Sequence, residues 1–317
     1  MRKAALLFNS DSGGRRGRRR AQLESVLAIL RDEGIEAELF MPESPEQARG
    51  MARQAVADGC DTVFAGGGDG TIHNIAQVLV NTQVALGILP MGTANALAHD
   101  VGLPMNVAAA ARAALHGVQR RVAVGRVQFV NLSNQTETRF FVVAAGAGVD
   151  AHLFYKLHGG VKQNMGMAAY YAKAWHLWFA HVMIRFRIEF AETGSAERQS
   201  ADVTELLAVR IRNFGGVLRE LAPGASLDRN DNRLIYCRTA SRLAFLHYVT
   251  RGFLGRQWRV KGIDLAHSER VSLAYLETPA GKRRGKIYIE ADGELVGALP
   301  AEITAVPDAL TLLVPVR

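Results

Sequence analysis

The sequence has few cysteines and no long run of uncharged apolar residues. Cys60 and Cys237 are the only cysteines among 317 residues, and they stand far apart, without the spacing of metal ligands. We therefore expect free thiols in a reducing compartment and no disulfide. The apolar segment at residues 4–8 is too short for a signal peptide and leads into polar residues, so we interpret it as the first strand of a cytoplasmic protein.

The most apolar stretch of the chain, residues 165–186, is interrupted by polar side chains. Lys173 and Arg185 are charged, and His176 and His181 add two more polar positions. A membrane-spanning helix needs about 20 residues with few charges. We therefore expect a buried helix here. A helix that lines or covers a lipid-binding cleft is the second interpretation, because aromatic residues with basic neighbours suit a membrane interface.

The chain carries an excess of positive charge, formally +8 at pH 7. Basic residues cluster at 15–20 and again at 282–286. Such a charge favours polyanions or an anionic membrane surface. No helix-turn-helix, zinc finger or aromatic RNA-binding motif accompanies these clusters, so we expect no nucleic-acid partner. A solvated basic face and a face that contacts nucleotide phosphates or acidic lipid headgroups both remain open.

The most informative segment is a glycine-rich loop that lacks the features of the two commonest nucleotide fingerprints. It consists of Gly66, Gly67, Gly68, Asp69, Gly70 and Thr71. A dinucleotide-binding loop would have glycine in place of Thr71, and a P-loop would have lysine after Gly70. The β-branched run before the loop and the helical pattern after it predict a strand, a glycine turn and a helix start, an arrangement that binds phosphate through backbone amides.

The acidic residue inside this loop needs a partner. Asp69 would repel a bare phosphate, so it requires a metal ion, a hydroxyl group to accept from or a proton to take. That combination indicates phosphoryl transfer. The alternative is a tight turn in which Asp69 caps a helix.

The order of the predicted elements divides the chain into two domains. Residues 1–118 alternate strand and helix, which indicates an α/β nucleotide-binding domain. Residues 119–317 contain mostly short strands, with helical insertions at 151–180 and 241–253, which predicts a mostly antiparallel β-sandwich. Strands are expected at 4–9, 37–41, 62–65, 84–89, 122–130, 139–145, 184–191, 203–212, 234–238, 258–264, 270–276 and 286–290.

Three motifs occur in the order and spacing of one known family. They are the glycine loop at 66–71, the segment Pro90-Met91-Gly92-Thr93-Ala94-Asn95-Ala96-Leu97-Ala98 and the late Asp292-Gly293-Glu294. With these motifs the chain resembles the diacylglycerol kinase catalytic-domain family, which includes bacterial lipid kinases, diacylglycerol kinases, sphingosine kinases and ceramide kinases. The resemblance implies phosphorylation of a lipid hydroxyl by ATP with Mg²⁺, in a cleft between an α/β domain and a β-rich lipid-binding domain. It also implies peripheral contact with the membrane surface, while the oligomeric state, a homodimer included, stays open.

The resemblance assigns nucleotide contacts to both loops. The residues concerned are Asn9, Gly66, Gly67, Gly68, Asp69, Gly70, Thr71, Gly92, Thr93 and Asn95. Backbone amides of the first loop and the Thr71 hydroxyl would hold phosphates, and the second loop would form the other wall of the site. Thr93 and Asn95 alternatively cap the helix that follows them, which does not exclude ligand contact.

Asp292 and Glu294 are the candidate catalytic carboxylates. Asp-Gly between two short strands by itself predicts a hairpin turn. The resemblance adds a catalytic base at Asp292, with the carboxylate of Glu294 close by. A lipid alcohol has a pKa far above neutral, so a carboxylate helps only by accepting the proton as the bond to phosphorus forms. In sphingosine-kinase-like members the aspartate that matches Asp69 takes this role. We assign Asp292 as the base and Asp69 as a ligand-orienting or metal-linked group.

The chain departs from the family pattern at several positions, two of which bear on the acceptor and on a metal ion. His73-Asn74 replace a common Asn-Glu pair after the glycine loop, and the acceptor stays open among diacylglycerol-like, phosphatidylglycerol-like and sphingoid lipids. The family holds a structural magnesium ion with the aspartate of an Asp-Gly-x-Leu segment and nearby carbonyl groups. Asp231 is the best match here, although Asn232 replaces the glycine, and a solvated turn is the alternative.

Two other functions remain. One is a kinase of a soluble substrate, since NAD kinases and phosphofructokinases also carry Gly-Gly-Asp-Gly, but the downstream Asn-Glu pair of NAD kinases is not evident here. The other is a non-catalytic nucleotide or lipid sensor on the same fold. Retention of Asp69, Asp292 and Glu294 argues against a sensor, because a pure binder needs no base.

Overall fold

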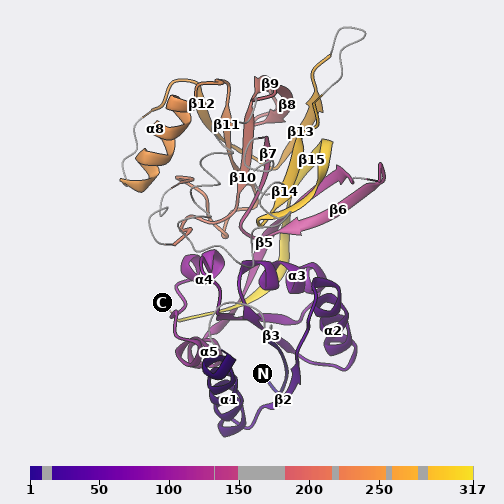
Figure 1. The fold of residues 1–317 in the computed structure, drawn as a ribbon, viewed down its shortest axis with the longest axis vertical. Coiled ribbons are helices and arrows are strands. Elements are labelled where there is room, and N and C mark those ends of the chain that lie inside the picture. The colour runs from indigo at the N-terminus through magenta and orange to yellow at the C-terminus, as the bar shows by residue number, and fades with distance from the viewer. Residues whose placement is uncertain are drawn as a thin grey trace. The chain divides into compact units, whose positions relative to one another are not determined.

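The computed structural model describes residues 1–8, 16–131, 133–148, 183–215, 221–254, 259–277 and 285–316 (Figure 1). The chain forms two compact units. The first contains Met1–Val124, Asn213–Arg219 and Val306–Arg317, and the second contains Gly125–Arg212 and Glu220–Ala305. The sequence-based division at residue 118 took no account of the two later segments that return to the first unit.

The first unit is built on a parallel sheet. Its strands are β1 (Lys3–Phe8), β2 (Glu36–Phe40), β3 (Thr62–Gly67) and β4 (Ala85–Pro90), in the order β4-β3-β1-β2. The end of β15 (Glu294–Val314) pairs in parallel with β4. Every residue of β3 and β4 is buried, as expected for parallel strands that helices cover on both faces.

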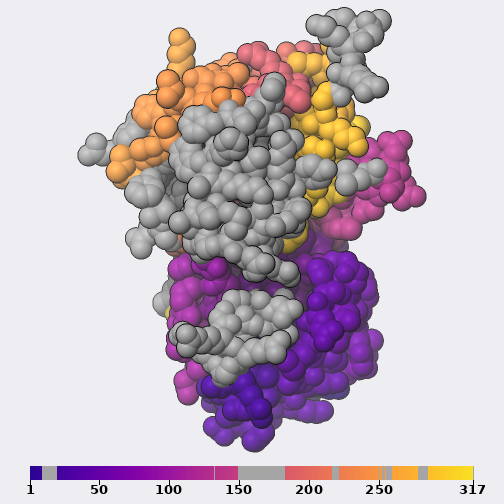
Figure 2. Space-filling view, viewed as in Figure 1, coloured from indigo at the N-terminus to yellow at the C-terminus, as the bar shows by residue number. Residues whose placement is uncertain are grey.

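Five helices connect and cover these strands. They are α1 (Arg16–Asp32), α2 (Pro45–Ala57), α3 (Asp69–Leu79), α4 (Ala96–Asp100) and α5 (Val107–Leu115). The side chains of Ser44 and Asn106 cap the N-termini of α2 and α5. Helices α1 and α5 share one apolar core with the sheet, and α2 packs against α3, with which it forms a continuous surface in the space-filling view (Figure 2).

The second unit is an antiparallel sandwich. Its strands are β5 (Val118–Val130), β6 (Thr136–Phe141), β7 (Ala144–Gly148), β8 (Phe186–Ala191), β9 (Arg198–Val203), β10 (Glu205–Val209), β11 (Asn232–Cys237), β12 (Ile263–Ser268), β13 (Arg270–Tyr275), β14 (Tyr288–Ala291) and the first part of β15. One layer has the order β12-β11-β10-β7-β14-β15, and β13, β8 and β9 continue from β15 in the other. A core of apolar side chains from both layers fills the interior. The one described helix of this unit is α8 (Arg242–Phe253).

The fold class expected from the sequence is confirmed, and most predicted strands agree with the structure to within a few residues. Four details differ. The predicted strand at 139–145 is two strands, β6 and β7, and the polar strand β9 was missed. The strand predicted at 258–264 lies further along the chain as β12, and β15 extends far beyond the predicted hairpin. Both cysteines are buried and free, as expected.

The predicted helical insertion at 151–180 lies outside the described residues. Among the residues that the structure does describe, none of the helices is both long enough and apolar enough to cross a membrane.

We expect Gly87→Ala to destabilise the first unit. Gly87 in β4 pairs with Phe64 in β3, and a Cβ at Gly87 would lie 2.5 Å from Cε1 of that buried ring. Overpacking of this kind costs about 1–3 kcal/mol. The control is Gly50→Ala, because Gly50 is an exposed residue of helix α2 with nothing within 4 Å of an added Cβ. That change should stabilise by about 0.5–1 kcal/mol. Urea unfolding measures the free energy of unfolding of both variants. Equal values for Gly87→Ala and Gly50→Ala would contradict the close packing of Gly87 against Phe64.

Candidate active site

The glycine loop forms the strand, turn and helix start that the sequence predicts. β3 ends at Gly67, Gly68 is the N-cap and α3 begins at Asp69. The N–H of Thr71 donates to the carbonyl of Gly68 at 2.9 Å, which closes the first turn of the helix. The N-terminus of a helix carries a partial positive charge, so this loop has the local structure of an anion-binding site.

The second loop comes so close to the first that the contact excludes a side chain at Gly92 and crowds one at Gly68. A Cβ on Gly92 would lie 2.5 Å from Cα of Gly68, and a Cβ on Gly68 would lie 3.2 Å from Cα of Gly92. The N–H of Met91 donates to the carbonyl of Gly67 at 2.9 Å and extends the pairing of β3 with β4 into the loops. The two predicted nucleotide loops therefore meet backbone to backbone in the first unit.

Asn95 holds the second loop in its shape. Its Oδ1 accepts from the N–H of Gly92 at 2.8 Å, and its Nδ2 donates to the carbonyl of Gly92 at 2.9 Å. The residue is buried and has a left-handed backbone (φ 48°), which asparagine adopts more readily than most residues. The oxygen and the nitrogen of the amide therefore both form hydrogen bonds within the loop. The side chain of Thr93 is exposed. Nucleotide contacts by these two residues stay a prediction.

Asp69 connects the two loops. Its Oδ1 accepts from the N–H of Ala96 at 2.8 Å, at the start of α4. The capping interpretation of Asp69 therefore has a structural basis, although the helix that it caps is α4 and not the helix that it begins. The predicted roles of Asp69 toward a ligand or metal are compatible with this bond and stay predictions.

Two residues that the sequence analysis did not assign support the glycine loop from outside. Nδ2 of Asn74 donates to the carbonyl of Gly70 at 2.8 Å, and Oδ1 of Asn74 accepts from Nη1 of Arg49. Arg49 also binds Glu46 within α2 at 2.8 Å. The four-residue spacing of Gly70 and Asn74 on a helix was a usable sequence signal for the first contact. The contact with Arg49 had no such signal.

The predicted hairpin turn at Asp292-Gly293 is confirmed. β14 and β15 pair in antiparallel fashion on either side of it, and both turn residues have positive φ, 49° and 82°. This is the backbone of the tight two-residue turn that favours Asp-Gly. Oε2 of Glu290, a buried carboxylate that the sequence analysis missed, accepts from the N–H of Gly293 at 2.8 Å.

The carboxylate of Asp292 binds the backbone between β6 and β7. It accepts from the N–H groups of Val142, Val143 and Ala144 at 2.9, 2.8 and 3.1 Å, and the N–H of Asp292 donates to the carbonyl of Ala144 at 2.8 Å. Asp292 therefore fixes its own turn against a second segment. This gives it a structural role whether or not it also accepts a proton, and the catalytic roles of Asp292 and Glu294 stay predictions.

The surroundings of Asp231 do not fit a magnesium ion. Nε and Nη2 of Arg229 donate to its two carboxylate oxygens at 2.7 and 2.6 Å, and Nδ1 of His267 lies 3.2 Å from Oδ1. Although burial by itself raises it, the pKa of Asp231 is lowered to about 2 by hydrogen bonds from Arg229 and Thr193 and by the neighbouring His267. Over the described ranges, no three His, Cys, Asp or Glu side chains come together as a metal site.

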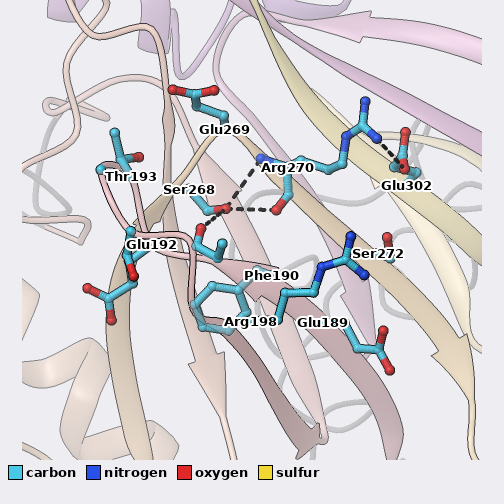
Figure 3. Close-up of a pocket in the computed structure, with 13 residues that line it drawn as sticks. Glu189, Phe190, Glu192, Thr193, Arg198, Ser268, Glu269, Arg270, Ser272 and Glu302 are labelled. Atoms are coloured by element: carbon cyan, nitrogen blue, oxygen red, sulfur yellow. Dashed lines mark hydrogen bonds and ion pairs between the residues drawn. The ribbon is translucent and has the colours of Figure 1, made fainter.

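A pocket of about 360 Å³ lies at the turns that join β8 to β9 and β12 to β13 (Figure 3). Its lining is polar and of mixed charge. Much of this polarity is satisfied internally: Oγ of Ser268 donates to the carbonyl of Ala191 at 2.7 Å, and Arg270 lies 3.7 Å from Glu302. None of the predicted site residues lines this pocket.

Asn9 and several residues of the two basic clusters lie outside the described residues.

Comparisons with known proteins decide the family. Residues 3–127 match the family described as "Diacylglycerol kinase catalytic domain", and residues 142–314 match the "YegS C-terminal NAD kinase beta sandwich-like domain". The chain is 31% identical over 299 residues to a protein of Mycobacterium tuberculosis (strain CDC 1551 / Oshkosh) named "Diacylglycerol kinase", covering 92% of this chain and 88% of that one. The chain belongs to the diacylglycerol kinase catalytic-domain family.

A second relative and a solved structure are also similar to the chain over nearly its whole length. A Bacillus subtilis (strain 168) protein named "Diacylglycerol kinase" is 26% identical over 305 residues, with 95% of this chain and 93% of that one covered. A crystal structure described as that of a diacylglycerol kinase from Bacillus anthracis str. Sterne superposes with a TM-score of 0.68 at 15% identity, covering 98% and 96% of the two chains. The latter likeness confirms the fold.

We expect Asn95→Ala to weaken ATP binding at least tenfold. The change removes both hydrogen bonds to Gly92 and places alanine in a left-handed backbone, a strain of about 1–2 kcal/mol. The control is Asn106→Ala, which removes the N-cap bond to Ala109 (3.0 Å) and about 1 kcal/mol of stability. Calorimetric titration with ATP and Mg²⁺ should show a loss of affinity for the first variant only. Equal affinities would contradict a nucleotide role for this loop.

Proposed function

We propose that this protein is an ATP-dependent lipid kinase that transfers the γ-phosphate of ATP to a lipid hydroxyl. The observation that carries the proposal is the contact of the two loops through Gly68 and Gly92, bridged by Asp69, in a member of the diacylglycerol kinase catalytic-domain family. Diacylglycerol is the first acceptor to test, because relatives that share nearly the whole length of the chain carry that name. Phosphatidylglycerol-like and sphingoid lipids follow it.

Phosphoryl transfer depends on positioning and on electrostatic stabilisation more than on covalent chemistry by the protein. We assign this task to backbone amides of residues 66–71, to the hydroxyl of Thr71 and to the N-terminus of α3. Asn74 and Arg49 keep the loop in place from behind. Magnesium that accompanies the ATP phosphates would neutralise charge that develops on them. Asp69 is the residue of this loop that we assign to orienting the ligand or its metal ion.

We assign proton removal from the lipid hydroxyl to Asp292, with Glu294 beside it in the same turn. The bonds from three backbone amides hold the Asp292 carboxylate in one orientation, which supports a positioned base. The same bonds occupy acceptor sites of the carboxylate, so the alternative is a purely structural Asp292 with the base role at Glu294. A comparison of the two variants therefore tests the assignment.

We infer that the protein is cytoplasmic and contacts the membrane surface peripherally, where it would meet its lipid substrate. The formal charge of +8 supports this, because acidic lipid surfaces attract basic proteins.

A kinase of a soluble substrate is the second candidate. It is favoured by the description of the matching C-terminal domain as NAD kinase-like.

The test of the proposal is phosphate transfer from labelled ATP in the presence of Mg²⁺. The acceptors are detergent-dispersed diacylglycerol, phosphatidylglycerol, sphingosine, ceramide and monoacylglycerol, with NAD and fructose 6-phosphate as soluble controls. We expect label in one lipid. Label in a soluble control alone would overturn the lipid-kinase proposal, and label in none would favour a nucleotide or lipid sensor.

We expect Asp292→Asn to lower kcat about 10²–10⁴-fold, which is the usual contribution of a general base. The variant also loses amide hydrogen bonds, so its kcat is compared per folded molecule, with the folded fraction taken from its thermal unfolding curve. Glu302→Gln is the control, because Glu302 lies on the same strand β15 and has only a long contact to Arg270 (3.7 Å). Unchanged kcat in folded Asp292→Asn, with a large loss in Glu294→Gln, would move the base to Glu294.

A further inference from the structure

Arg210 is a charged side chain with no exposed surface (0%) in the second unit. It directly follows β10, and its backbone N–H donates to the carbonyl of Val143 at 2.9 Å. Burial of a guanidinium group opposes folding unless hydrogen bonds and opposite charge compensate for the lost water. The hydrogen-bond acceptors that replace water around the guanidinium of Arg210 therefore indicate the role of this side chain.

The guanidinium of Arg210 is held by carbonyl oxygens of the turn before β11. Nη2 donates to the carbonyl of Arg229 at 2.7 Å, and Nη1 donates to the carbonyl of Asp231. Carbonyl oxygens that converge on one positive charge, next to a carboxylate, are the usual way in which a loop binds a hard metal ion. In this turn the positive charge belongs to the chain itself.

The carboxylate beside these carbonyls already has its own cation. Arg229 binds both oxygens of Asp231 in the forked geometry that suits a carboxylate, and His267 occupies a further position on Oδ1. A metal ion at Asp231 would have to displace Arg229 and approach the guanidinium of Arg210. Repulsion between such charges is strong where burial lowers the effective dielectric constant.

The neighbouring residue Asn232 does not complete a metal site at this turn. Asn232 is fully buried, and within the part of the chain that the structure describes neither its Oδ1 nor its Nδ2 has a hydrogen-bond partner. A metal ion would satisfy only the oxygen and leave the amide nitrogen without an acceptor. A buried water molecule, which both donates and accepts, satisfies the two atoms together.

We propose that Arg210 is the built-in cation of the 229–231 turn and takes the part that the family resemblance gives to a structural magnesium ion. Burial lowers the pKa of Arg210 to about 10, and Asp231 opposes this fall, so the group stays charged at neutral pH. The proposal is independent of the reaction that the protein catalyses. Its consequence for an assay is that any requirement for Mg²⁺ belongs to the nucleotide and not to the fold.

The first test measures thermal unfolding of the full chain without nucleotide, in EDTA and in a series of Mg²⁺ concentrations. For each protein, native and Asp231→Asn, we expect a midpoint that does not change with the Mg²⁺ concentration. The midpoint of the variant should be lower than that of the native protein in every solution. A saturable rise of the native midpoint with Mg²⁺ that Asp231→Asn abolishes would overturn the proposal. Calorimetric titration of the native protein with Mg²⁺ should likewise give no binding that depends on Asp231.

The second test removes the guanidinium. Arg210→Met should lower the midpoint by about 10 °C or more, because buried carbonyls lose their partner. The control is Arg187→Met, since Arg187 forms an exposed pair with Asp202 at 2.9 Å and should change the midpoint little. Where Arg210→Met does not fold, Arg210→Lys takes its place, because it keeps the charge without the forked guanidinium. The unfolding midpoint of Arg210→Lys should lie below that of Arg187→Met, but by less than a complete loss of folding. A midpoint of either Arg210 variant equal to that of Arg187→Met would overturn the proposal.

Discussion

The site in the first unit depends on the contact between the backbones of Gly68 and Gly92. β3 and β4 are neighbouring parallel strands, so their carboxyl ends bring the two following loops to the same edge of the sheet. At this edge the loops touch with no side chain between them. Asp69 then ties the first loop to the start of α4, and Asn95 closes the second loop on itself. A larger residue at either glycine would separate the groups that we assign to one nucleotide.

The three candidate site aspartates, Asp69, Asp231 and Asp292, are all structural members of the fold. Asp69 binds the N–H of Ala96, Asp292 binds three successive N–H groups and Asp231 binds Arg229. A carboxylate with several acceptor positions holds separate backbone segments together. For Asp69 and Asp292 these bonds are compatible with the roles that we propose, because a reacting group must first be held in place. For Asp231 it does compete, since the ion pair occupies the positions that a metal ion needs.

Strand β15 explains why the first unit cannot be described without the end of the chain. It begins immediately after the Asp292-Gly293 turn, pairs with β14 and β13, and ends as a parallel neighbour of β4. The turn that carries the candidate base therefore directly precedes a strand whose other end belongs to the parallel sheet of the first unit. A change in the register of β15 would move both.

The sequence by itself determined the elements, the fold class and the local shape of the motifs. Periodicity, glycine at the loop and Asp-Gly at the hairpin act over a few residues, so they are readable without the structure. Only the tertiary structure decided which partners each carboxylate has. Asp69 meets Ala96 across 27 residues, Asp292 meets Val142 across 150, and Arg210 reaches the carbonyl of Asp231 across 21. Such contacts follow from how separate strands and loops pack, and no local pattern encodes them.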